Sequence, residues 1–165
     1  MKASRRMPAQ LPMLYGSLRN VLDGHPVTTS PAIAITATVS AAIALMRKHD
    51  VDAVMAMDDG RCAGLFTAHD AALRVVGAKR DASAMRVGEA LPGEAPSVDL
   101  NTPIGQALDF MTEHHCQYLV VTANGRLLGM LSRHDLTDWV IRSQQEQIDC
   151  AIRAVKRIGF ASGRG

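Results

Sequence analysis

Two stretches of this chain have the same order of residue types: DDGRCAGLFTAHD at residues 58–70 and ANGRLLGMLSRHD at residues 123–135. Each contains an Asp-Gly or Asn-Gly pair, which accepts positive φ angles and favours a two-residue hairpin turn. Each continues through apolar residues to a glycine and then to Thr-x-x-Asp or Ser-x-x-Asp. The final residues, Asp70 and Asp135, are 65 positions apart (135 − 70), and this offset indicates an internal repeat.

The same offset extends over the surrounding sequence. Residues 39–76 and 104–141 align without gaps, and nine of the 38 positions are identical. In both copies apolar residues first follow an i, i+3, i+4, i+7 spacing, which predicts a helix with one buried face. These residues are Val39, Ala42, Ile43 and Met46 in the first copy, and Ile104, Ala107, Leu108 and Met111 in the second. Strands are then expected at residues 53–57, 62–66, 118–122 and 127–131, with a hairpin turn inside each pair.

Each copy also has a lead-in, at residues 18–22 and 87–91, and a second helix is expected to begin near Thr67 or Ser132. Neither copy can cover both faces of its small sheet, so we expect the two to pack together in an α+β fold. The chain then divides into an N-terminal tail or short helix (1–17), a first repeat (18–76), a linker (77–86), a second repeat (87–142), and a C-terminal helix and tail (143–165).

Composition limits the classes of function. The formal charge is only +2, so nucleic acid is not an expected main partner. No apolar run approaches the roughly 20 residues of a membrane-spanning helix, so no membrane partner is expected. Three cysteines without CxxC spacing are typical of a reduced, cytoplasmic protein.

The second-copy helix is expected to continue past residue 141. Its apolar residues keep a near-heptad spacing at Ile141, Ile148, Ile152 and Val155. This stripe has two interpretations, a helix packed on its own domain or an arm that dimerises, and periodicity in one chain cannot separate them.

The heptapeptides at residues 64–70 and 129–135, here called the two signatures, fit the pattern Gly-hydrophobic-x-Thr/Ser-x-x-Asp. Together with the repeat, they make residues 18–142 resemble a tandem pair of cystathionine-β-synthase-type (CBS) domains, a Bateman module. The resemblance implies two βαββα repeats related by pseudo-twofold symmetry, here followed by an extended C-terminal helix. It also implies a stand-alone bacterial homodimer that binds adenine nucleotides (AMP, ADP or ATP) or related adenosyl compounds (NAD or S-adenosylmethionine) in clefts between the repeats.

The signatures suit such a ligand chemically. Asp70 and Asp135 fall in the first turn of a helix, where a carboxylate can accept two hydrogen bonds from a ribose diol. The hydroxyls of Thr67 and Ser132, with nearby backbone N–H groups, can bind phosphate oxygens. Leu65 and Met130 can cover an adenine face. The same Thr-x-x-Asp and Ser-x-x-Asp patterns also cap helices, and both roles can coexist.

By resemblance, each cleft is composite. One site is expected to join Thr102, Ala107, Cys116 and Gln117 to Leu65, Thr67, His69 and Asp70. The other is expected to join Thr36, Thr38, Ala42, Val51 and Asp52 to Met130, Ser132, His134 and Asp135. Two departures weaken the second site: Ala37 stands where the offset pairs it with Thr102, and Asp52 places an acid where an anion could approach. We therefore rank the Thr102/Asp70 site first.

No catalytic or metal-binding arrangement is evident. Six histidines are present, but they lack the spacing of three or four convergent ligands. The chain has no Ser-His-Asp order, phosphate-binding-loop lysine or GxGxxG motif. We expect a non-catalytic regulator that requires no cofactor, senses a small ligand and acts on an unknown protein partner. The alternative is an interaction or oligomerisation scaffold whose clefts are vestigial.

Overall fold

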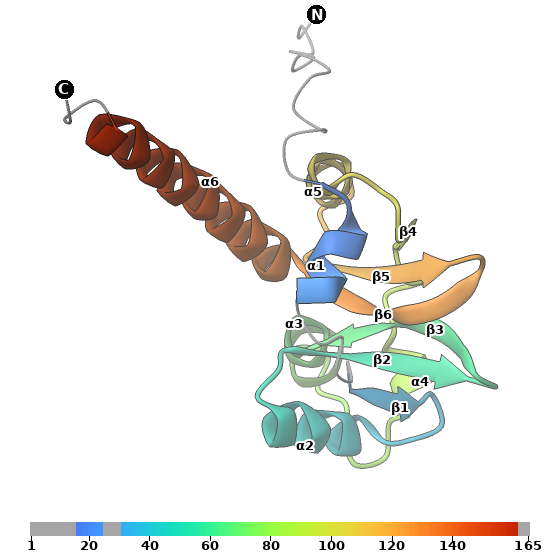
Figure 1. Ribbon diagram of the computed structural model, residues 1–165. Helices are drawn as coiled ribbons and strands as arrows, with labels where there is room; N and C mark the ends of the chain where they lie inside the picture. The colour runs from blue at the N-terminus through green and yellow to red at the C-terminus, as the bar shows by residue number, and fades with distance from the viewer. Residues whose placement is uncertain (1–15, 25–30, 162–165) are drawn as a thin grey trace, which may run out of the picture.

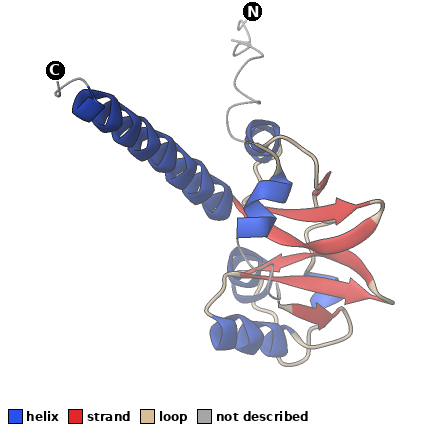
Figure 2. Ribbon diagram, in the orientation of Figure 1, coloured by secondary structure: helices blue, strands red, loops and turns tan. Residues whose placement is uncertain are grey.

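Each repeat forms its own three-stranded sheet in the computed structural model, which describes residues 16–24 and 31–161 (Figures 1 and 2). In each sheet the first strand pairs parallel with the second, and the second pairs antiparallel with the third. The strands are β1 (Ala32–Ala34), β2 (Ala53–Asp58) and β3 (Arg61–Thr67) in one sheet, and β4 (Ser97–Asp99), β5 (Tyr118–Ala123) and β6 (Arg126–Ser132) in the other. The predicted α+β class and the four main strands are confirmed.

The two hairpins turn where the sequence predicts. Asp59 and Gly60 have φ angles of 44° and 79°, and Asn124 and Gly125 have φ angles of 50° and 73°. Two successive residues with positive φ match the twist of antiparallel strands, which explains why Asp-Gly and Asn-Gly stand there.

Helices α2 (Val39–His49) and α5 (Ile104–Glu113) bury the predicted faces. Val39, Ala42 and Met46 are buried in α2, and Ile104, Ala107 and Met111 are buried in α5. The hydroxyl of Thr38 accepts a hydrogen bond from the backbone N–H of Ala41, so Thr38 caps the start of α2. Local spacing therefore gives the correct helices in both repeats.

The lead-in helices exchange places between the repeats. Leu18 and Val21 of α1 (Leu18–Gly24) are fully buried in the core of the second repeat. Val87 and Ala90 of α4 (Val87–Ala90) are fully buried in the core of the first. Each repeat therefore completes its core with a helix that precedes the other in sequence.

Backbone hydrogen bonds fix this exchange. The N–H of Leu18 donates to the carbonyl of Thr102 at 3.0 Å, and the N–H of Val87 donates to the carbonyl of Ala37 at 2.9 Å. Ala37 and Thr102 are equivalent positions under the 65-residue offset, so the two lead-ins dock in the same way.

A third apolar cluster joins the two sheets. Met55, Leu65 and Val120 are buried there, and Tyr118 and Met130 pack against them. Figure 1 shows the β2–β3 hairpin stacked beside the β5–β6 hairpin. The pseudo-twofold relation between the repeats passes through this contact, next to both signatures.

The helices that follow the signatures differ. After β3, a short α3 (Ala68–Asp70) leads into η2 (Ala71–Val76), a π-helix in which the N–H of Gly77 donates to the carbonyl of Ala72 at 2.8 Å. After β6, α6 (Arg133–Ala161) runs for 29 residues, about 43 Å at the usual helical rise. The predicted long C-terminal helix is confirmed, and Figure 1 shows it projecting away from the sheets.

Among the described side chains of α6, those near its start pack on its own domain. Leu136 is fully buried, and Trp139 and Val140 pack against the core of the second repeat. Beyond them, the side chains of the predicted stripe are exposed: Ile141 64%, Ile148 53%, Ile152 48% and Val155 69%. The predicted tail or helix at residues 1–17 lies almost entirely outside the described residues.

Candidate functional site

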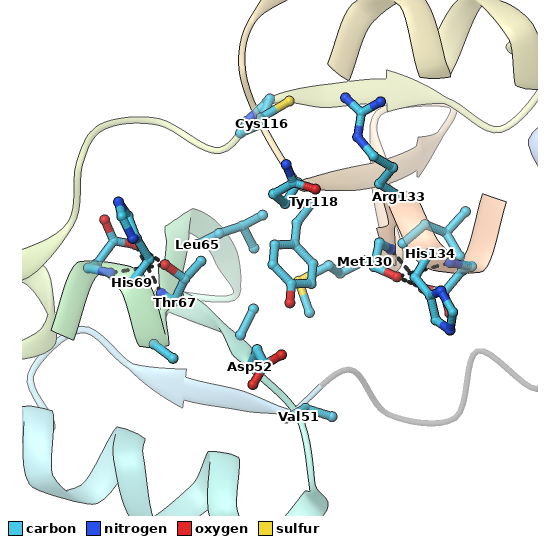
Figure 3. Close-up of a pocket in the computed structure, with 18 of the residues that line it drawn as sticks. Val51, Asp52, Leu65, Thr67, His69, Cys116, Tyr118, Met130, Arg133 and His134 are labelled. Carbon is cyan, nitrogen blue, oxygen red and sulfur yellow. Dashed lines mark hydrogen bonds between the residues drawn. The ribbon is translucent and has the colours of Figure 1, made fainter. Parts of the chain in front are cut away.

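Both signatures line one continuous cleft between the repeats, with a volume of about 1430 Å³. Figure 3 shows Thr67 and His69 at one end of the cleft and His134 at the other, with Tyr118 and Met130 between them. The structure brings twelve of the predicted ligand-binding residues into this cleft: Val51, Asp52, Leu65, Thr67, His69, Asp70, Cys116, Gln117, Met130, Ser132, His134 and Asp135. Contact with a ligand stays a prediction for all of them.

Two of the other predicted residues are buried away from the cleft. Ala42 and Ala107 are fully buried in the separate cores of the two repeats. Neither alanine is among the residues that line the cleft, and their contact with a ligand stays a prediction.

The remaining three predicted residues also do not line this cleft, and each forms hydrogen bonds elsewhere in the protein: Thr36, Thr38 and Thr102. The carbonyl of Thr36 accepts a hydrogen bond from Nη1 of Arg86 at 2.6 Å, and Thr38 caps α2. The carbonyl of Thr102 accepts from Leu18. The exchanged lead-ins cover these segments, which sequence spacing could not reveal. Comparing Ala37 with Thr102 therefore gives no structural reason to rank the two sites, whereas Asp52 does lie in the cleft.

The first signature forms a complete helix cap. Oδ2 of Asp70 accepts hydrogen bonds from the backbone N–H of Thr67 at 3.0 Å and from its hydroxyl at 2.6 Å. The Thr67 hydroxyl in turn accepts from the N–H of Asp70 at 3.1 Å. The other carboxylate oxygen, Oδ1, lies 3.4 Å from Nε of Arg74. The cap therefore uses Oδ2 of this buried carboxylate, whereas Oδ1, in its ion pair with Arg74, can still accept a further hydrogen bond.

The second signature forms the same cap with a different environment. Oδ2 of Asp135 accepts from the N–H of Ser132 at 2.7 Å and from its hydroxyl at 2.6 Å. Trp139 occupies the position that corresponds to Arg74, and within the described part of the chain no hydrogen bond reaches Oδ1. Asp135 is also less buried than Asp70. The capping interpretation is thus confirmed for both signatures, and Asp135 retains an oxygen for a ligand.

Sequence reasoning missed Tyr118, which projects into the middle of the cleft (Figure 3). Burial raises the pKa of its phenol, and the negative charges of Asp52 and Asp135 raise that pKa further. The hydroxyl therefore remains a neutral hydrogen-bond donor beside two carboxylates. The signal that could have identified it is the repeat offset, which pairs this aromatic residue with Ala53.

The side chains of Arg133 and His134 in the second signature contact partners within the protein. Nη1 of Arg133 lies 3.3 Å from the Thr112 hydroxyl of α5, and Nε2 of His134 lies 3.2 Å from Oδ2 of Asp138. Burial raises the pKa of the Cys116 thiol, and the nearby Arg133 charge partly opposes this increase. Among residues 16–24 and 31–161, no three His, Cys, Asp or Glu side chains gather in a way that could hold a metal ion.

A loop after α4 forms part of the cleft wall. Pro92, Gly93, Glu94 and Pro96 line the cleft, and a Cβ at Gly64 would come within 2.8 Å of the Gly93 carbonyl oxygen. Because a side chain at position 64 would collide with this carbonyl, a glycine there allows the loop to approach closely.

The described helices include none with the length and apolar character needed to cross a membrane. This finding concerns helical spans only.

Comparison with known proteins agrees with this architecture. A family model described as "CBS domain" matches residues 21–77 and 87–142. Hypoxic response protein 1 of Mycobacterium tuberculosis is 31% identical over 100 residues, which are 60% of this chain and 70% of that protein. The CBS domain-containing protein YhcV of Bacillus subtilis is 28% identical over 120 residues, 73% of this chain and 82% of that protein.

The fold is also close to that of solved structures. A protein with CBS domains from Burkholderia ambifaria MC40-6 superimposes with a TM-score of 0.74 and 29% identity, covering 78% of this chain and 96% of that chain. Two family matches, a repeated sheet topology and the paired signatures at one cleft lead to the same assignment. This chain belongs to the CBS domain family and carries two CBS domains in tandem.

Proposed function

We propose that this protein is a non-catalytic regulatory module that binds an adenine nucleotide or a related adenosyl compound in the cleft between its two CBS domains. The observation that carries the proposal is the arrangement of the two signatures in one cleft, with a carboxylate and a hydroxyl at each end. Carboxylates accept hydrogen bonds from ribose diols, and apolar side chains such as Leu65 and Met130 can cover a base.

Proteins of the same fold give further support. A CBS domain protein from Pyrobaculum aerophilum and the protein CBSX2 were both determined in complex with AMP. The CBS domain of a bacterial CNNM/CorC family Mg²⁺ transporter was determined in complex with ATP. Their identities to this chain are 22%, 18% and 17%, so the likeness concerns the fold, and the ligand is transferred only as a proposal.

Mass spectrometry of the small molecules released when the purified protein is denatured tests this function directly. We expect an adenosyl compound in the extract, together with binding of AMP or ATP by calorimetric titration. ATP incubated with the protein and magnesium should remain unhydrolysed. Failure of AMP, ATP and adenosine to bind would reject the ligand-sensing proposal, and steady phosphate release proportional to protein concentration would reject its non-catalytic part.

A scaffold function is the second candidate, and the exposed stripe of α6 favours it. Ile141, Ile148, Ile152 and Val155 alternate by seven, four and three residues and so share one face of the helix. We propose that a second copy of this chain covers the stripe in a homodimer.

The two candidates are compatible, because the exposed stripe from Ile141 to Val155 includes no residue that lines the cleft. A protein that dimerises but binds no adenosyl compound would favour the scaffold alone.

A further inference from the structure

Equivalent positions of the two repeats carry different residues where they line the cleft. The 65-residue offset pairs Asp50 with His115, Asp52 with Gln117, and Ala53 with Tyr118. All six residues line the cleft. The backbone confirms the equivalence, since Asp50 and His115 both adopt positive φ, 53° and 51°. The cleft is therefore symmetric in backbone but not in charge or shape.

Tyr118 projects into the middle of the cleft from the side of the second signature. It is the first residue of β5 and pairs with Ser132, just as Ala53 begins β2 and pairs with Thr67. A phenol therefore stands beside the second signature where a methyl group stands beside the first. Figure 3 shows the Tyr118 ring between Leu65 and Met130, with its hydroxyl directed toward Asp52.

The end of the cleft at the second signature is the more acidic. Tyr118 pairs with Ser132, whose hydroxyl donates to Asp135, and Figure 3 shows the Tyr118 hydroxyl directed toward Asp52. Beyond the effect of burial, the charges of both carboxylates accordingly raise the pKa of the Tyr118 phenol. The basic side chains of the second signature contact other partners, Arg133 the Thr112 hydroxyl and His134 the Asp138 carboxylate. At the other end, the repeat relation gives Gln117 the place of Asp52.

The first signature has its negative charge balanced. Asp70 pairs with Arg74, at 3.4 Å between Oδ1 and Nε. An anion that enters the Asp70 end therefore meets a paired carboxylate and a neutral amide. An anion that enters the Asp135 end meets two carboxylates, Asp52 and Asp135, for which the described residues provide no Lys or Arg ion pair.

This difference is large enough to discriminate ligands. Even at the permittivity of water, a phosphate dianion held about 6 Å from one carboxylate loses about tenfold in affinity. The hydroxyls of a ribose diol are hydrogen-bond donors, so the same carboxylates attract a nucleoside without phosphate.

We propose that the two ends of the cleft select ligands by charge: the Asp70 end accepts an adenine nucleotide, and Tyr118 and Asp52 restrict the Asp135 end to adenosyl compounds that lack phosphate. This inference rests on the proposed adenosyl-binding function. It names Tyr118 and Asp52 as specificity-determining residues and gives the chain one nucleotide site and one nucleoside site.

Calorimetric titrations with AMP and adenosine at low salt test the proposal. The wild-type protein should bind one AMP per chain, and the AMP-saturated protein should bind one adenosine more. The double variant Asp52→Gln/Tyr118→Ala gives the Asp135 end the residues of the Asp70 end. It should gain a second AMP per chain, with an affinity at that end raised about tenfold or more. Adding Asp135→Ala to the double variant should abolish this second event.

Two further variants keep the test decisive. Asp52→Asn preserves shape and packing, so it should strengthen AMP binding at the Asp135 end even if Tyr118→Ala weakens the contact between the sheets. The reciprocal pair Ala53→Tyr/Gln117→Asp should weaken the AMP site of the Asp70 end. If Tyr118 and Asp52 had only a structural role, their substitution would not increase the number of AMP molecules bound per chain.

The outcomes separate this inference from the proposed function. Two equivalent AMP sites in the wild type, or no added AMP in Asp52→Asn and the double variant, would overturn charge selection while leaving adenosyl binding intact. AMP binding without any adenosine binding would overturn it as well. Absence of binding by either compound to the wild type and all variants would overturn the proposed function and this inference with it.

Discussion

Arg74 pairs with Asp70 across one turn of the helix that follows the first signature, with 3.4 Å between Nε and Oδ1. The equivalent carboxylate, Asp135, is followed at the same spacing by Trp139. The two signatures thus have the same helix cap, but their carboxylates differ. Asp70 forms an ion pair, whereas Oδ1 of Asp135 accepts no hydrogen bond from the described residues. We therefore expect substitution of the two acids to affect different ligands.

Replacing the signature acids should separate ligand binding from helix capping. Asp70→Ala should weaken AMP binding about tenfold to a hundredfold, because charge-assisted hydrogen bonds to a ribose contribute about 1.5–3 kcal/mol. Asp135→Ala should weaken adenosine binding by a similar factor and AMP binding little. Both should lower the free energy of unfolding by about 1 kcal/mol through loss of the cap. Calorimetric titration and thermal melts of each variant measure the two effects separately. Unchanged affinities beside lowered stability would leave only the capping role.

The pKa of the Tyr118 phenol should depend on the two carboxylates near it. Its pKa is raised above 10.0 by burial and by Asp52 and Asp135, so Asp52→Asn should lower that pKa toward the ordinary value. The folded state holds the proton more tightly than the unfolded chain. The resulting stabilisation is complete below the unfolded pKa and is lost as pH rises through the folded value. Ultraviolet titration of tyrosinate, in a Tyr15→Phe background that leaves Tyr118 as the single tyrosine, measures the shift. An unchanged titration curve in Asp52→Asn would place the two groups apart.

The exchanged lead-ins should make the repeats unfold together. Val87 is fully buried in the core of the first repeat, whereas Trp139, the single tryptophan, packs on the core of the second. Val87→Ala should therefore lower two unfolding midpoints equally: that measured by Trp139 fluorescence, which reports the second repeat, and that measured by circular dichroism, which reports the whole chain. Leu18→Ala should also destabilise the protein, by about 2–5 kcal/mol, as expected for a large buried side chain. Two separate transitions in Val87→Ala would contradict cooperative interlocking.

Charge placed on the apolar stripe of α6 should abolish the proposed dimer. Size exclusion with light scattering should give about twice the 17.7 kDa chain mass for the wild type and about one chain mass for Ile148→Asp/Ile152→Asp. Both side chains are about half exposed, so folding should not suffer. Cys150→Asp is the matched control: it adds the same type of charge to the opposite face of the helix and should remain dimeric. A wild-type monomer at micromolar concentration would reject the pairing.

The sequence by itself determined the repeat and the local structure within it. The hairpins at Asp59-Gly60 and Asn124-Gly125, the buried faces of α2 and α5, and the capped signatures all depend on residues within a few positions of one another. Such interactions leave a short-range pattern that survives in both copies, so turns, helices and the family resemblance could be predicted together.

Three features could be found only in the folded protein. Each lead-in helix completes the core of the other repeat. Both signatures line one cleft, and Tyr118 lies between them. The periodicity of an apolar segment predicts that one face is buried, but apolar side chains such as Leu18 and Val87 carry no information about which distant core receives them. Ala42 and Ala107 are fully buried in the two cores, on the helix faces that the periodicity predicts, and their contact with a ligand stays a prediction. Function at this cleft depends on contacts between residues far apart in sequence, and those contacts exist only once the two repeats have packed.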